Sequence, residues 1–308
     1  MKPDPFTRDS AVRHPGAQPT SAVSAPTPGD DGRLEGRRLS HRFGDRWALR
    51  DVAFSARQGE FVALFGPNGS GKSTLLRTLA GLITPTRGEV TLHGTPLSRL
   101  GRRHLAQRVG FLPQVRPALR HVTVRELVAR GRHPHQRFGW VESREDRDHV
   151  DRALAILGLE PFADRDVAAL SGGELQRAWL GVVVAQDPQI VLLDEPVTFL
   201  DLRHQWSLLE FLHDLSALRG KTIVAVFHDV NHGLAVADTA YLMHEGHVVR
   251  HGHPNDVVTG SSIADVFGIF ADVWRSRDGR SAFVVPDGCR SCRRHFRQGF
   301  GPERDARS

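Results

Sequence analysis

The chain has 308 residues, of which 40% are hydrophobic and 25% are charged, proportions that are ordinary for a globular protein and sufficient for a sizeable core. The net charge of +6 does not indicate nucleic-acid binding, because 35 acidic residues are interspersed with the 41 basic ones, and only Lys2, Lys72 and Lys221 are lysines. Two cysteines, no apolar run near the roughly 18 residues that span a bilayer, and no signal peptide together exclude a disulfide framework or a membrane-spanning protein and favour the cytoplasm.

The two ends of the chain differ in composition from the part between them. Residues 1–32 contain six prolines and many small or polar residues without an apolar period, so we expect disorder there. Residues 288–308 are rich in Arg and Gly and are also expected to be disordered. Their Cys289, Cys292 and His295 could bind a metal, but one C-x-x-C without a second pair favours a disordered tail. We therefore expect one folded domain over residues 33–287.

Strand-like and helix-like segments alternate along this domain. The turn at Gly44 and Asp45 separates two strand-like runs, and Thr123 and Ser143 have the sequence context of helix N-caps. The expected strands are 37–42, 48–56, 61–65, 89–92, 190–193 and 222–227, and the expected helices are 123–129, 143–157, 171–185 and 202–218. Such alternation predicts an α/β fold with a largely parallel sheet covered on both faces, interrupted by a helical, Arg-rich insertion.

A glycine-rich loop between an apolar run and an amphipathic run matches the pattern G-x-x-x-x-G-K-[ST]. In a strand-loop-helix unit of this kind, backbone N–H groups and the positive end of the helix point at phosphate oxygens. Lys72 would reach the outer phosphates and the Ser73 hydroxyl would hold Mg²⁺. The loop consists of Gly66, Pro67, Asn68, Gly69, Ser70, Gly71, Lys72, Ser73 and Thr74. It predicts a nucleoside triphosphate site and leaves kinases, GTPases and motor ATPases open.

Two carboxylates follow the apolar strand at 190–193. Asp194, at the tip of the strand, is placed to reach Mg²⁺ directly or through water. Glu195 beside it can polarise a water for in-line attack on the γ-phosphate. A buried strand followed by an exposed acidic turn would have the same sequence, but the phosphate loop upstream favours hydrolysis.

A second helix start with anion-binding character occurs in Leu170–Arg177, which reads LSGGELQR. Ser171 and two glycines begin the helix, so that a hydroxyl and free N–H groups face outward. This segment is similar to the signature motif of ABC-type ATPases, and the resemblance covers about residues 34–285. It implies an α/β P-loop NTPase core with a mostly parallel sheet, an N-terminal antiparallel β-subdomain and an α-helical insertion at about 115–180.

The resemblance also implies a head-to-tail homodimer, in which Lys72 of one copy and the segment with Ser171 and Gly173 of the other hold the same ATP. Phe43 resembles the aromatic residue that stacks on adenine, although a core position suits it equally and Trp47 is nearby. Val197 departs from the family pattern, where a small polar residue is usual, and we expect it to alter local packing rather than chemistry.

Three further residues resemble functional positions of the family. Gln114 corresponds to the glutamine that contacts Mg²⁺ and the attacking water and links the site to the helical insertion. Asp201 corresponds to the aspartate that communicates across the dimer. His228 corresponds to the histidine that contacts the γ-phosphate and, with Glu195, orients the water. Each of these side chains alone would be weak evidence, but their order with the two longer motifs favours the functional interpretation.

Two short segments point to a subgroup of the family. Residues 130–135 (RGRHPH) and 198–202, with His204 and Gln205, resemble the ATPase subunits of bacterial iron–siderophore, haem and cobalamin importers. His133 and His135 could be read as a metal site. A contact surface for a permease loop is favoured, because such ATPases act in the cytoplasm and do not touch the cargo.

Together these resemblances imply an ATPase that uses ATP and Mg²⁺ to power import of iron–siderophore complexes, or of haem or cobalamin. Two copies would dock beneath a membrane permease at the cytoplasmic face, an extracytoplasmic binding protein would deliver the cargo, and no nucleic acid would take part. The alternative is a soluble ABC-type ATPase that acts on ribosomes or nucleic acid, although such relatives usually carry two ATPase cores or a long coiled coil. Glu195 and His228 argue against a third alternative, a regulatory module without turnover.

Overall fold

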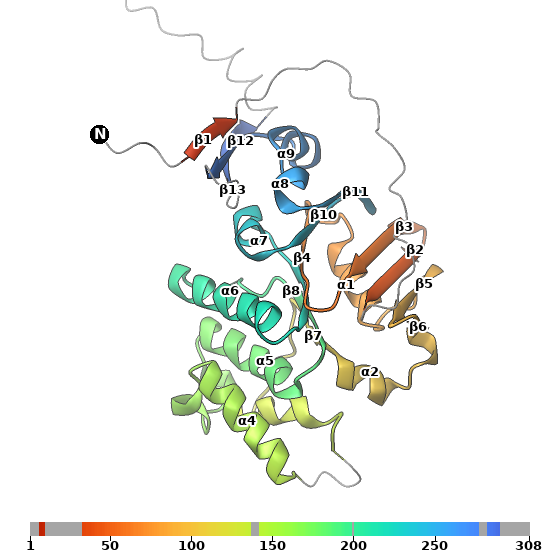
Figure 1. The fold of residues 1–308 in the computed structure, drawn as a ribbon. Coiled ribbons are helices and arrows are strands. Elements are labelled where there is room, and N and C mark those ends of the chain that lie inside the picture. Colours follow the sequence, from red (N-terminus) through yellow and green to blue (C-terminus); the bar gives the residue numbers. More distant parts are fainter. Residues whose placement is uncertain (1–5, 10–32, 137–141, 199, 277–281, 290–308) are drawn as a thin grey trace, which may run out of the picture.

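The computed structural model describes residues 6–9, 33–136, 142–198, 200–276 and 282–289. A central sheet is flanked by an antiparallel sheet on one side and by helices on the other, and a third, small sheet lies at the end of the molecule away from the helical insertion (Figure 1). This architecture confirms the predicted α/β fold with its antiparallel β-subdomain and its helical insertion.

The central sheet has the order β11-β10-β4-β9-β8-β7, in which β11 alone runs antiparallel to its neighbour. Its strands are β4 (Phe61–Phe65), β7 (Val109–Leu112), β8 (Ile190–Asp194), β9 (Thr222–Val226), β10 (Thr239–His244) and β11 (His247–Gly252). All residues of β4, β8 and β9 are buried. These strands are therefore continuous apolar runs, as expected of parallel strands covered on both faces.

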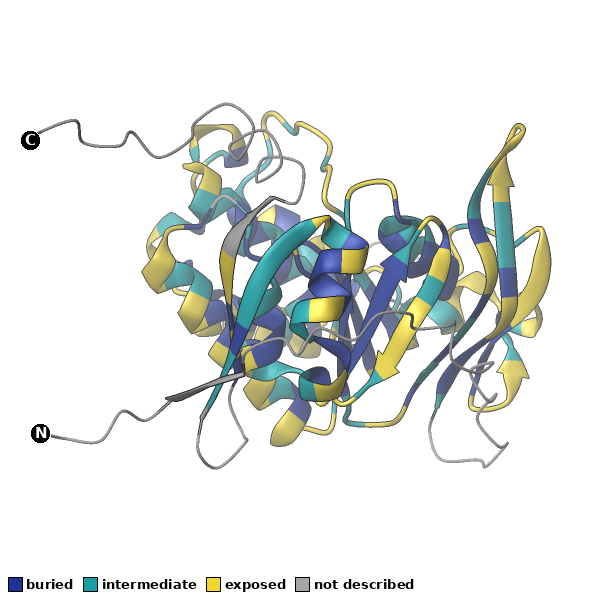
Figure 2. Ribbon diagram, turned by 90° about the horizontal axis from the view of Figure 1, so that it is seen from above, coloured by how far each residue is buried: buried dark blue, intermediate teal, exposed yellow. Residues whose placement is uncertain are grey.

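Alternate side chains of one strand contribute to two separate cores. Phe61, Ala63 and Phe65 of β4 belong to the core beneath the helical insertion and the C-terminal helices. Val62 and Leu64 belong to the core shared with the antiparallel sheet. Because successive side chains of a strand point to opposite faces, a five-residue strand can join both layers of the domain. In Figure 2 the buried residues lie along these central strands and the exposed ones on the outer sides of the helices.

The antiparallel sheet has the order β3-β2-β5-β6 and packs beside the helix that follows the phosphate loop. It contains β2 (Leu34–Phe43), β3 (Arg46–Ala56), β5 (Arg87–Leu92) and β6 (Thr95–Pro96), and near it lie α1 (Lys72–Leu79), a 3-10 helix at Leu97–Arg99 and α2 (Arg102–Arg108). The turn between β2 and β3 lies at Gly44 and Asp45, as predicted, and Gly44 has a φ of 56°.

The helical insertion begins after β7. It contains α3 (Val124–Ala129), a 3-10 helix at Arg130–Arg132, α4 (Arg144–Ile156), 3-10 helices at Glu160–Phe162 and Val167–Ala169, and α5 (Gly172–Gln186). Thr123, Ser143 and Ser171 each form a complete capping box, in which the cap side chain and the third helical residue exchange hydrogen bonds. The cap signals in the sequence therefore predicted the three helix starts correctly.

The C-terminal part adds elements that the sequence analysis did not predict. After α6 (Leu202–Ala217) come α7 (Val230–Val236), α8 (Pro254–Val257), α9 (Gly260–Phe267), β12 (Ile269–Ser276) and β13 (Ala282–Cys289), and β1 (Phe6–Asp9) pairs antiparallel with β12. Disorder was expected for residues 6–9, but they form this strand, because β12 presents an edge whose backbone groups need a partner. Residues 288 and 289, assigned to the C-terminal tail, likewise end β13. The other tail residues, Cys292 and His295 included, lie outside the described residues.

Candidate functional site

The phosphate loop connects β4 to α1, and its glycines are required by the backbone. Gly66 has a φ of 146° and Gly71 a φ of 102°. A Cβ atom on Gly66 would lie 2.2 Å from the Met243 carbonyl oxygen, and one on Gly71 would lie 2.4 Å from the Ala48 carbonyl oxygen. The loop is thus packed directly against the backbone of β10 and β3. Any residue with a Cβ atom at position 66 or 71 would clash with that backbone and would be strained at the observed φ.

Lys72 folds back over the loop that it follows. Its Nζ donates hydrogen bonds to the carbonyl oxygens of Gly66 at 2.7 Å and Pro67 at 2.9 Å. Burial lowers the pKa of the Lys72 ammonium, although the nearby carboxylates of Glu195 and Asp194 raise it. The ammonium is therefore positioned by neutral carbonyl groups and can exchange them for the more strongly attracting oxygens of a phosphate.

Ser73 and Asp194 meet beneath the loop. The Ser73 hydroxyl donates to Asp194 Oδ1 at 3.0 Å, and Asp194 is fully buried. Burial raises the pKa of Asp194, and the hydrogen bond from Ser73 opposes that rise. Asp194 Oδ2 is buried without a hydrogen-bond partner in the described structure. A buried carboxylate oxygen with a free coordination position beside a hydroxyl fits a hard divalent cation such as Mg²⁺.

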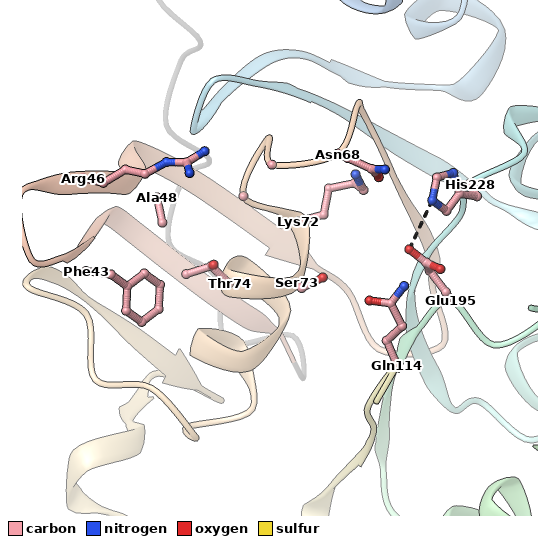
Figure 3. A pocket seen from close by; sticks show the side chains of 12 residues that line it. Phe43, Arg46, Ala48, Asn68, Lys72, Ser73, Thr74, Gln114, Glu195 and His228 are labelled. Carbon is pink, nitrogen blue, oxygen red and sulfur yellow. Dashed lines mark ion pairs between the residues drawn. The ribbon is translucent and has the colours of Figure 1, made fainter. Parts of the chain in front are cut away.

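Above these residues lies a cavity of about 600 Å³ (Figure 3). Lys72, Gln114, Glu195 and His228 all line it, although they follow four different strands. His228 Nε2 lies 3.5 Å from Glu195 Oε1, and Thr198 Oγ1 donates to Glu195 Oε2 at 3.3 Å. Glu195 has a φ of 55°, in the left-handed region that is unfavourable for a side chain of its kind. Such a conformation persists where surrounding contacts hold it.

The opposite end of the cavity is formed by the antiparallel sheet. Phe43 is 55% exposed and lines the cavity, so the core alternative for Phe43 is excluded. Trp47 does not line it and instead lies against the guanidinium groups of Arg42 and Arg87. The structure therefore assigns the aromatic cavity wall to Phe43.

Sequence analysis missed Arg46 and Ala48, which line the same cavity (Figure 3). The Arg46 guanidinium reaches the phosphate loop, since its Nη2 lies 3.5 Å from the point where a Cβ atom on Gly69 would lie. The period of a strand could have found both residues, because positions 46 and 48 share one face of β3. The available signal was a cationic and a small residue, two positions apart, on the strand that follows the turn at Gly44 and Asp45.

The predicted residues of the second anion site do not line this cavity. Ser171 is exposed at the start of α5, where its Oγ accepts from the Glu174 N–H at 3.3 Å. Gly173 lies against Leu200, and Asp201 caps α6 by accepting from the His204 N–H at 2.9 Å. Gly66, Pro67 and Ser70 build the loop without lining the cavity, whereas Asn68, Gly69, Gly71, Lys72, Ser73 and Thr74 line it.

The RGRHPH segment bonds to the end of α5 and to α2. His135 Nε2 lies 3.0 Å from the Gln186 carbonyl oxygen, and Arg103 Nε donates to the Pro134 carbonyl at 2.9 Å. In the described part of the chain, no three His, Cys, Asp or Glu side chains gather in a way that could hold a metal ion. The same part contains no helix with the length and apolarity that crossing a bilayer requires.

Comparison with known proteins agrees with this geometry. A family model described as ABC transporter matches residues 49–198. The chain is 40% identical to the ferric enterobactin transport ATP-binding protein of Escherichia coli (strain K12), covering 83% of this chain and 94% of that protein. It is 39% identical to the petrobactin import ATP-binding protein of Bacillus anthracis, with 76% and 86% covered.

Among solved structures, the dimeric structure of a bacterial ABC transporter cassette matches with a TM-score of 0.64 at 29% identity, covering 72% of this chain and 98% of the cassette. The same cassette has been solved in a post-hydrolysis state bound to ADP and Pi, with the same TM-score and coverage. These matches extend well beyond the phosphate loop, which many nucleotide-binding families share. The chain therefore belongs to the ABC transporter family and is one of its ATP-binding, ATP-hydrolysing proteins.

Proposed function

We propose that this ATPase powers the import of iron–siderophore complexes and that two copies complete each other's nucleotide sites. The observation that carries the proposal is the composition of the cavity. It gathers an aromatic wall, a phosphate loop with its lysine and a glutamate–histidine pair, whereas the exposed helix start at Ser171, the proposed second phosphate-binding site, does not line it.

In the proposed site, adenine lies against Phe43 and the phosphates lie along the loop from Gly69 to Thr74. Lys72 transfers its hydrogen bonds from the loop carbonyls to the outer phosphates, where its charge offsets that of the γ-phosphate. Glu195 accepts a proton from the attacking water, and His228, 3.5 Å away, fixes the direction of the Glu195 carboxylate. Nucleotide binding and proton acceptance thus occur in one cavity.

The residues around Ser73 fit Mg²⁺. Ser73, Asp194 and the amide of Gln114 would supply oxygen ligands, and the unpartnered Asp194 Oδ2 would offer a coordination position. When bound there, the cation would neutralise charge on the phosphate oxygens. The protein would orient the ligands. The Ser73 hydroxyl bonds to Asp194 Oδ1, which leaves Asp194 Oδ2 pointing away from that hydroxyl.

A second copy supplies the missing half of the site. Ser171, with Gly173, would present the start of α5 to the phosphates of the partner's ATP, and the exposed Asp201 would lie at the same interface. This arrangement is supported by the exposure of Ser171 and by the dimeric state of the related cassette.

The dimer is tested with the variant Glu195→Gln, which should bind ATP without hydrolysing it and so accumulate as an ATP-loaded dimer. Adding Ser171→Arg should leave ATP binding intact but keep the protein monomeric, whereas adding Ser171→Thr, which retains the capping hydroxyl, should preserve the dimer. Size-exclusion chromatography with light scattering, with and without ATP, measures both. An ATP-dependent dimer of the Ser171→Arg double variant would contradict the proposal.

For the cargo, the relatives named for enterobactin and petrobactin support a siderophore importer, with haem and cobalamin as the other candidates. The chain would then bind a membrane permease at the cytoplasmic face, while an extracytoplasmic protein delivers the cargo. Growth of a deletion strain on defined siderophores under iron limitation tests this assignment. Recovery of ribosomes or nucleic acid instead of a polytopic membrane protein in a pull-down would favour the soluble alternative.

A further inference from the structure

The side-chain amide of Gln176 is buried in α5 and uses both of its ends. Gln176 is 1% exposed, although most glutamines lie at the surface. Its Nε2 donates to the carbonyl oxygen of Pro196, the residue after Glu195. Its Oε1 accepts from Nη1 of Arg116. The orientation of the amide is therefore fixed, since flipping it would place like groups against each other at both ends.

Arg116 lies two residues after Gln114, in the segment that enters the helical insertion. Its Nε donates to the Pro113 carbonyl oxygen at 3.2 Å, so the guanidinium bonds to its own segment as well as to α5. Within the described residues, no carboxylate forms a salt bridge with Arg116. Arg116 is half-buried, and among the residues that the structure describes its guanidinium bonds only to the neutral acceptors Pro113 and Gln176.

The chain of contacts ends at a strained turn. Glu195 has a φ of 55°, and this conformation must be held by its surroundings. Thr198 holds the Glu195 side chain at 3.3 Å, whereas Gln176 holds the backbone at the next residue. A displacement of the Pro196 carbonyl would move the peptide between Pro196 and Val197, and with it the turn that carries the Glu195 carboxylate.

From this geometry we infer that Arg116 is a positioning residue that links the Gln114 segment to the Glu195 turn through the buried amide of Gln176. Gln114 and Glu195 line the same cavity after two different strands, and the Arg116–Gln176 and Gln176–Pro196 contacts together join the segments that carry them. Because Arg116 itself is not among the cavity-lining residues, it acts on hydrolysis only through the position of these two side chains. The inference rests on the proposed role of Glu195 as the proton acceptor.

The link predicts a specific kinetic signature. Arg116→Met removes the guanidinium but keeps a long apolar stem, and it should lower kcat about 10- to 100-fold, while the Kd for ATP changes less than about threefold. Arg116→Lys, which can still reach Gln176 Oε1 with an N–H donor, should recover part of the loss. Gln176→Glu, which keeps the contact with Arg116 but loses the donor to Pro196, should also lower kcat.

The test measures kcat, KM and ATP affinity of the purified full-length protein for these variants and for Arg116→Met/Gln176→Glu. Because both residues act in one chain of contacts, the double variant should lose no more than about twice what the worse single variant loses. Arg125→Met, which removes an exposed arginine of the same insertion, is the matched control and should keep the parental kcat. Thermal unfolding of every variant checks that the fold is retained.

A parental kcat for Arg116→Met, losses that multiply in the double variant, or a loss confined to ATP affinity would each overturn the inference. Glu195→Gln is measured in parallel, and parental hydrolysis by that variant would instead refute the role of Glu195. The two failures are thereby distinguished.

Discussion

Removing the charge of Asp146 should destabilise the protein far more than removing an equivalent charge at the surface of the same insertion. Arg132 and Asp146 are each 4% exposed, and Arg132 Nε donates to Asp146 Oδ1 at 2.9 Å. Asp146 Oδ2 accepts from the backbone N–H and the hydroxyl of Ser143, and Arg132 Nη1 donates to the Ala185 carbonyl at the end of α5. The pair therefore connects the start of α4 to the end of α5.

Asp146→Asn keeps the shape of this side chain but removes its charge and turns one acceptor into a donor. The new NH₂ group faces either Arg132 or the Ser143 N–H, both of which are donors, and the buried guanidinium loses its counter-charge. Breaking a buried pair in this way typically costs about 3–5 kcal/mol. Taking about 3 kcal/mol for this conservative change, the melting temperature should fall by about 6–12 °C.

The control is Asp151→Asn, which breaks the Arg125–Asp151 pair on the same insertion. These side chains are 45% and 58% exposed, so solvent screens the pair and we expect a loss of at most about 1 kcal/mol. Urea and thermal unfolding followed by circular dichroism measure both variants. If Asp146→Asn and Asp151→Asn destabilise the protein equally, the argument from burial is wrong.

The pH dependence provides a second readout for Asp146. Burial alone would raise the pKa of its carboxyl group, but the hydrogen bonds from Arg132 and Ser143 hold it below the ordinary value of 3.8. A folded-state pKa below the unfolded-state value means that the stabilisation is complete above the ordinary carboxyl pKa. It is lost as the pH falls through the lowered value. The difference in stability between the parent and Asp146→Asn should therefore be constant near neutral pH and shrink only in strong acid.

Three further variants test the nucleotide site. Glu195→Gln should lower kcat a hundredfold or more with ATP affinity retained, and equal turnover in single-turnover assays would exclude Glu195 as the base. Arg46→Gln should raise the KM for ATP several-fold at unchanged kcat, more so at low ionic strength, because it removes a cation beside the phosphate loop; a salt-independent KM would contradict this. Gly71→Ala should abolish binding of a fluorescent ATP analogue, since its Cβ would meet the Ala48 carbonyl oxygen at 2.4 Å, and measurable affinity would show that the loop can rearrange.

Much of the fold could be predicted because its signals are local in sequence. A capping box requires contacts between residues only three positions apart, so Thr123, Ser143 and Ser171 specified three helix starts on their own. The apolar run ending at Asp194 specified a buried strand, and the glycine pattern from residue 66 specified the phosphate loop with Lys72 and Ser73.

The remaining features depended on contacts between segments far apart in the chain. Whether Phe43 or Trp47 faces the cavity depends on how the antiparallel sheet packs beside α1, and the strand at residues 6–9 exists because β12, more than 250 residues later, offers it an edge. The bond between Arg116 and Gln176 joins residues 60 positions apart. By itself the sequence determined which chemical groups the site contains, because each group sits in a short motif with its own backbone requirements. Only the tertiary structure decided which of these groups share one cavity and which, like Ser171, face outward, because that depends on how the central sheet brings distant strand ends together.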